Sequence, residues 1–209
     1  MHHTSTLPPR FLLLLVALGT LAACGGTQQP ETMQTHGATP DYGAPPDRAH
    51  VIFVRHTSAQ SEHDFVVLDS DGGYVATLRG NMHTVVDLAP GEHTFYVLAE
   101  NAERLRATLE AGRTYIVETR PHAGFAAGDG VVVEAVPIER LAEVRGWVST
   151  TSAMVPDQAQ GDAWVAQRKR QIDQKIASAE ASWLEQDVFW RRKHTVQPTH
   201  GLTASQLGL

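Results

Sequence analysis

Between residues 49 and 136, short runs of β-branched and aromatic residues alternate with turn residues. The segment Ala89-Pro90-Gly91-Glu92 places Pro before Gly, as in a type II turn. No helical periodicity of about ten residues intervenes, which disfavours a parallel sheet built from βαβ units. Short strands with frequent turns instead predict a mainly β domain over 49–136, an antiparallel β-sandwich of about seven or eight strands. The expected strands are 50–55, 64–68, 74–78, 84–88, 93–98, 104–109, 114–118 and 131–136.

Residues 137–193 are expected to form a C-terminal helical extension. Pro137 can open a helix in which Leu141, Val144 and Val148 recur at helical spacing. A second helix is predicted over residues 162–192, where an apolar stripe runs between charged neighbours. The stripe consists of Ile172, Ile176, Ala179, Trp183 and Trp190.

All four tryptophans fall in this extension, at positions 147, 164, 183 and 190. Three interpretations are open. The helices can pack on the sandwich, where each buried anchor contributes about 1.5–3 kcal/mol. The stripe can dock an envelope protein, since Trp is common at interaction hot spots. The segment from Trp183 to Lys193 can also lie on a membrane interface.

The N-terminus has the parts of a secretory signal. Arg10 precedes an apolar run from Phe11 to Ala22, which is too short to span a bilayer, since about 20 residues are needed. The run ends in Leu21-Ala22-Ala23-Cys24, which resembles the lipobox of bacterial lipoproteins. This resemblance implies that residues 1–23 are a cleaved signal peptide and that Cys24 is acylated. Multiple acyl chains then give stable membrane attachment.

Two segments are expected to be disordered. Residues 24–48, beginning with the lipidated Cys24, are rich in Gly, Pro, Thr and Gln and read as a tether of about 25–30 Å. Residues 194–209 lack hydrophobic periodicity and read as a tail.

Three local motifs in residues 49–136 follow one another in a specific order. They are Ala49-His50-Val51-Ile52-Phe53-Val54-Arg55, a hairpin with the pattern PGxHxF over residues 90–95, and an AGxxY turn and strand over residues 111–115. In this order they resemble a bacterial lipoprotein family, domain of unknown function 2846, with a PEGA-like or transthyretin-like β-sandwich. The resemblance implies a cell-envelope location and brings no established activity.

Histidine is the most plentiful residue type that could carry chemistry in the domain. His50, His56, His63, His83 and His93 could converge on a metal ion, because His is the commonest metal ligand. No HExxH motif supports this, so surface or turn positions are the default, and no metal or cofactor residue is assigned.

Other reactive motifs are equally weak. Asp69-Ser70-Asp71-Gly72-Gly73 begins like a calcium loop but lacks the later residues of that pattern, so it is interpreted as a hairpin turn. No GxSxG motif is present and the single cysteine is expected to be acylated, so no catalytic residue is assigned.

These features predict a lipid-anchored envelope protein that is not an enzyme and serves as a non-catalytic binding or scaffolding module. Its expected partners are the membrane, through Cys24, and an envelope protein, through the Trp-bearing helix. A net charge of −6 without a basic stripe argues against nucleic acid. Gly25 in place of Asp after the cysteine favours the outer over the inner membrane. The alternatives are a metal-dependent envelope hydrolase using the strand histidines and a small-ligand-binding sandwich.

Overall fold

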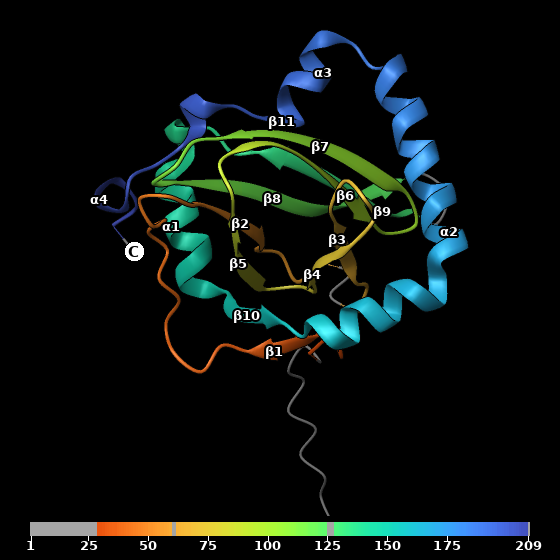
Figure 1. The fold of residues 1–209 in the computed structure, drawn as a ribbon, viewed down its shortest axis with the longest axis horizontal. Coiled ribbons are helices and arrows are strands. Elements are labelled where there is room, and N and C mark those ends of the chain that lie inside the picture. Colours follow the sequence, from red (N-terminus) through yellow and green to blue (C-terminus); the bar gives the residue numbers. More distant parts are fainter. Residues whose placement is uncertain (1–28, 60–61, 125–127, 209) are drawn as a thin grey trace, which may run out of the picture.

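A computed structural model describes residues 29–59, 62–124 and 128–208. Cys24 and the signal segment lie outside the described residues. Within the described residues, eleven strands form two sheets that face each other, with helices on the outer sides (Figure 1). No helix in this part of the chain is long and apolar enough to cross a membrane.

The larger sheet has six strands in the order β1-β10-β5-β2-β8-β9. Its centre is β2, which pairs antiparallel with β5 and parallel with β8. At one edge, β10 pairs parallel with β5 and antiparallel with β1. The strands are β1 (Met33–Thr35), β2 (Ala49–Arg55), β5 (Met82–Leu88), β8 (Arg113–Gly124), β9 (Gly128–Ala135) and β10 (Ser152–Pro156).

The smaller sheet has five strands in the order β11-β7-β6-β3-β4. Its pairs are antiparallel except for the parallel pair of β11 with β7. The strands are β3 (Phe65–Leu68), β4 (Tyr74–Leu78), β6 (Gly91–Leu98), β7 (Ala102–Leu109) and β11 (Thr195–Val196).

Side-chain alternation along β2 shows how the layers are held together. Phe53 points into the space between the sheets, where its ring meets Phe95 of β6 edge to face at 5.4 Å. Ile52 and Val54 point to the opposite face, into a second apolar cluster that includes Val144. Because β2 is buried on both faces, it reads as a continuous apolar run rather than as an alternating strand.

Helices cover both outer faces. The helix α1 (Leu141–Thr150) packs on the six-stranded sheet through this second cluster, and α2 (Gln158–Glu185) crosses the five-stranded sheet. Glu180 of α2 binds Arg104 of β7 at 2.8 Å and accepts a hydrogen bond from Tyr96 of β6. The remaining helices are short: η1 (Ile138–Arg140), α3 (Val188–Lys193), η2 (Pro198–His200) and α4 (Ala204–Leu207).

The mainly β class and the helical C-terminal region are confirmed, but the expected strand number and antiparallel arrangement are wrong. The sheets are mixed, and β1, β10 and β11 were not expected. These three strands are short segments whose pairing partners are distant in sequence, so their own composition carries little strand signal. The predicted helix over 162–192 is also divided, because Gln186 is extended and Asp187 caps a new helix by accepting the Trp190 amide hydrogen.

The turn that contains Pro90 and Gly91 is not the expected hairpin. It joins β5 of one sheet to β6 of the other, and Gly91 has a φ of 130°. The turn at Gly112, with a φ of 70°, likewise leads from β7 to β8 across the two sheets. Both turns are therefore corners of the sandwich, where glycine permits a backbone that other residues rarely adopt.

The predicted disorder of the tether and the tail is wrong for the parts of them that the structure describes. Met33 of β1 is 1% exposed, and Leu202 and Leu207 near the C-terminus are similarly buried. Their segments also bond to the sheets, since Leu202 and Thr114 exchange backbone hydrogen bonds of 2.9 Å. A few apolar side chains dock these segments, because Met33 joins one apolar cluster of the core and Leu202 and Leu207 join the other.

Candidate functional site

The five candidate histidines are distributed over the molecule. His50 is on β2, and His93 of β6 stacks on Phe95 while its Nε2 contacts the carbonyl oxygen of Ala89 at 2.8 Å. His63 lies beside Glu62. Across residues 29–59, 62–124 and 128–208, no group of three or more His, Cys, Asp or Glu side chains could hold a metal ion. The described chain therefore offers no ligand set for the metal-dependent alternative.

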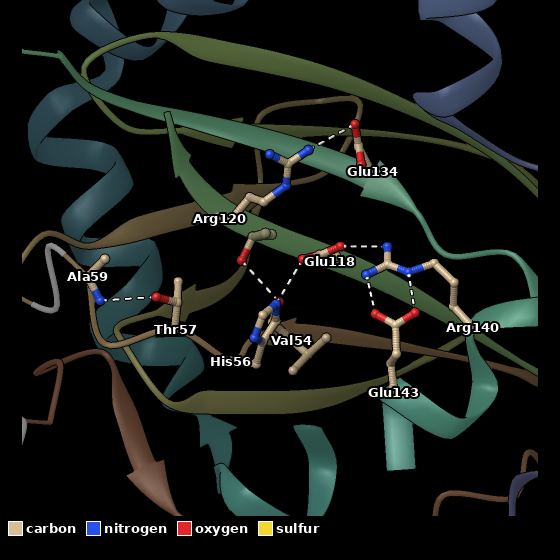
Figure 2. A network of polar contacts seen from close by, with 10 residues as sticks. Val54, His56, Thr57, Ala59, Glu118, Arg120, Glu134, Arg140 and Glu143 are labelled. Atoms are coloured by element: carbon tan, nitrogen blue, oxygen red, sulfur yellow. Dashed lines mark hydrogen bonds and ion pairs between the residues drawn. The ribbon is translucent and has the colours of Figure 1, made fainter. Parts of the chain in front are cut away.

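His56 belongs to a polar network on the outer face of the six-stranded sheet (Figure 2). Glu118 of β8 is almost fully buried and uses both carboxylate oxygens. Its Oε1 lies 2.8 Å from His56 Nε2, and its Oε2 accepts a hydrogen bond of 2.9 Å from Arg140. Arg140 also forms a two-point ion pair with Glu143 of α1, at 3.1 and 2.8 Å.

An aromatic ring completes this network. Trp147 of α1 stacks on His56 with ring centroids 4.3 Å apart, and the Arg140 guanidinium lies 4.8 Å from the Trp147 ring. Hydrogen bonds that Arg140 donates to Glu143 and Glu118 raise the pKa of Arg140 above its ordinary value. Because these charged groups pair with one another, the network holds α1 on the sheet and has a structural role.

His83 forms a second polar cluster inside the six-stranded sheet. The Thr151 hydroxyl donates to the carbonyl oxygen of Trp147 at 2.8 Å, so it accepts from His83 Nδ1 at 2.7 Å. His83 Nε2 then accepts from the Tyr42 hydroxyl at 3.0 Å. This pattern matches one neutral tautomer, and burial lowers the pKa of His83 to about 4. Both nitrogens of the imidazole are therefore used to hold Tyr42 and Thr151 in place.

An open groove lies between α2 and the five-stranded sheet. It consists of two adjoining hollows of about 420 and 330 Å³, and we call it the α2 groove. The hollows share four lining residues, Asp64, Val66, Trp164 and Arg168. Their sizes are those of small-ligand sites, which are commonly about 300–1,000 Å³.

The α2 groove combines an apolar floor with charges of both signs. Leu98 and Ile172 are its buried apolar lining, and Glu62 and Glu100 are exposed acidic residues of the same lining. The Arg168 guanidinium lies 4.7 Å from the Trp164 ring, and its hydrogen bonds within α2 are long, at 3.4 Å. Arg168 and Trp164 together offer a cation and an aromatic face to a ligand.

Lys175 closes one end of the groove. Its ammonium donates to the carbonyl oxygens of Ala99 and Glu100, the latter at 2.8 Å, and burial lowers the Lys175 pKa. Asp64 is also engaged, because it pairs with Arg79 through two bonds of 2.7 and 2.9 Å. Arg168 and the two glutamates are therefore the charges most accessible to a ligand.

The sequence did not identify this groove. Trp164 is one of the four tryptophans of the predicted extension, and its sequence context does not link it to Arg168 in a binding site. Their spacing of four residues on one helix face was the available signal. By contrast, the interpretation of Asp69–Gly73 as a hairpin turn is confirmed, since the Asp69 carboxylate accepts the backbone amides of Asp71 and Gly73 at 2.9 and 2.7 Å.

Comparison with known proteins gives no match to a protein-family model, a curated protein or a solved structure. The function is therefore inferred from the geometry of the chain itself.

Proposed function

We propose that this protein is a lipid-anchored, non-catalytic binding module of the bacterial cell envelope, and that its ligand occupies the α2 groove. The open pair of hollows around Trp164 and Arg168 is the observation that carries this proposal. The histidine clusters support it by contrast, because their polar atoms are used in internal contacts.

The lining of the α2 groove favours a short peptide or a similar zwitterion. Arg168 can pair with a carboxylate, and guanidinium–carboxylate pairs are among the stronger polar contacts in proteins. Glu62 and Glu100 can pair with an ammonium group. Apolar side chains of the ligand would cover Trp164 and Leu98. The proposed module therefore binds a small ligand, as in the small-ligand alternative.

The envelope location is supported by the lipobox-like segment before Cys24 and by the resemblance of residues 49–136 to an envelope lipoprotein family. The described body begins at Gln29. A fully extended chain from Cys24 to Gln29 spans about 18 Å at most. An acyl chain on Cys24 would therefore hold the body close to the bilayer surface.

Calorimetric titration of the full chain in detergent with tripeptides that have free termini tests the groove. We expect Trp164→Ala and Arg168→Ala each to weaken binding by about tenfold or more, because each removes a major contact. Arg170→Ala is the matched control, since Arg170 is exposed on the same helix. Equal binding by all variants, or no binding by the native protein, would exclude the groove as a peptide site.

The anchor is tested separately. Mass spectrometry of the secreted protein should show an N-terminal Cys24 that carries acyl mass. A Cys24→Ala protein should leave the membrane fraction or remain unprocessed. A mature N-terminus at another residue would contradict the anchor while leaving the groove result unaffected.

A further inference from the structure

A separate hollow lies where α2 meets α3, and it shares no lining residue with the α2 groove. It has a volume of about 430 Å³, and we call it the arginine hollow. Arg106 of β7 and Arg191 and Arg192 of α3 line it, together with Trp183 and Val188. Three arginines from two elements therefore line one hollow.

These three arginines are not neutralised by the protein. In the described chain, none of them has a carboxylate within ion-pair distance, and Arg191 Nε is buried without a hydrogen-bond partner. Other arginines do have such partners: Arg48, Arg79, Arg104, Arg120 and Arg140. The sequence has 23 acidic and 17 basic residues, so acidic partners are not scarce.

Unpartnered positive charge in a hollow is the arrangement that binds an anion. A guanidinium presents a planar fork of donors that matches phosphate oxygens, and a buried donor without a partner costs free energy until it is satisfied. A phosphate group carries up to two charges and three acceptor oxygens at neutral pH. A phosphate can therefore accept hydrogen bonds from several arginines at once, whereas a carboxylate has only two oxygens for them.

Exposed apolar residues of α2 and α3 lie in the hollow or next to it along the chain. Val188 lines it with 62% of its surface exposed, and the neighbouring Leu184 and Phe189 are 76% and 70% exposed. Exposed large apolar residues that gather beside a charged hollow mark an interaction site. A ligand with an apolar group next to its phosphate would use both features of this surface.

The position of the hollow separates it from the anchor. In Figure 1, α3 lies at the top of the molecule and β1, close to where the described chain begins, lies at the bottom. A body anchored near β1 would present α3 to the aqueous side. We propose that the arginine hollow binds a soluble phosphomonoester with an apolar substituent, the phosphate on Arg106, Arg191 and Arg192 and the substituent on Val188 and Phe189.

Titration of the full chain, in micelles of a neutral detergent, with phenyl phosphate and with inorganic phosphate tests this assignment. We expect both to bind, with phenyl phosphate the tighter. Arg106→Gln and Arg192→Gln should each weaken both by about tenfold or more, because each removes a charge-assisted contact. Phe189→Ser should reduce only the advantage of phenyl phosphate.

Arg170→Gln is the control for the loss of one positive charge. Arg106 and Arg192 are exposed, so thermal unfolding should show that their variants remain folded. Absence of phosphate binding, or binding that the two arginine variants leave unchanged, would overturn the proposal. Binding only to phosphatidylglycerol added to the micelles would also overturn it and would assign the surface to lipid. None of these outcomes depends on a ligand in the α2 groove.

Discussion

Burial gives His83 a role that depends on its protonation state. The side chain is 1% exposed, and both ring nitrogens are engaged with hydroxyl groups from Tyr42 and Thr151. A proton on Nε2 would place a charge in the interior and would require the Tyr42 hydroxyl to turn its hydrogen away and accept. The neutral ring is therefore part of the folded state, and the unfolded chain binds the proton more readily.

This difference makes stability depend on pH. The folded pKa is about 4 and the ordinary value is 6.5, so the contribution of His83 is fully present above pH 6.5 and is lost as pH falls toward 4. The loss approaches about 3 kcal/mol. Urea unfolding at about pH 7.5 and about pH 4.5 should show a smaller difference for His83→Leu than for the native protein.

A control at His122, which is exposed, removes a histidine from the surface of the same chain. His122→Leu should keep the pH dependence of the native protein. If His83→Leu keeps it as well, the buried imidazole is not its source.

At the scale of elements, the seating of α2 depends on one glycine. A Cβ at Gly161 would lie 1.9 Å from a ring carbon of Tyr74, and the Tyr74 hydroxyl is fixed by donating to the carbonyl oxygen of Thr32 at 3.0 Å. Neither partner can move without breaking a buried contact. The first turns of α2 can therefore approach β4 only because residue 161 has no side chain.

Gly161→Ala should lower the free energy of unfolding by about 2–3 kcal/mol or more, because the methyl group overpacks the contact with Tyr74. Gly146→Ala in α1 is a matched control, since nothing lies within 4 Å of its added Cβ. At position 146, the higher helix propensity of Ala over Gly should raise the free energy of unfolding by about 1 kcal/mol. Urea titrations compare the two, and equal effects would contradict the close contact at Gly161.

Elements that are specified by their own residues could be predicted from the sequence. The strand 74–78 agrees with β4, and Val144 and Val148 lie on the buried face of α1 as their spacing predicts. Short strands that depend on pairing with a distant strand could not be predicted, as for Met33 in β1 and Thr195 in β11. The α2 groove was missed for the same reason, because Trp164 meets Asp64 only after α2 packs on the five-stranded sheet.

At the scale of the whole molecule, the described body leaves only a short link to Cys24. An anchored protein should therefore hold a preferred face toward the bilayer, with Glu31 near the membrane and Phe189 far from it; both are exposed. Acylation of the single native cysteine would leave introduced cysteines as the only free thiols. This makes the orientation measurable.

Fluorophores attached to Glu31→Cys and Phe189→Cys in proteoliposomes should respond differently to brominated lipids. We expect strong quenching at position 31 and little at position 189, because quenching requires contact with the bilayer. Similar quenching at both sites would show that α3 reaches the membrane and would favour the interfacial interpretation of its apolar residues.

The pairing of distant segments also sets the order in which the molecule can assemble. β1 needs β10 as a partner, and the isolated bridge at Thr114 needs Leu202, close to the C-terminus. In an exported chain, β1 could pair only after residues 154–156 had passed the translocation channel, and Thr114 could pair only after Leu202 had passed. These late pairings would keep such a chain unfolded enough to pass through the channel.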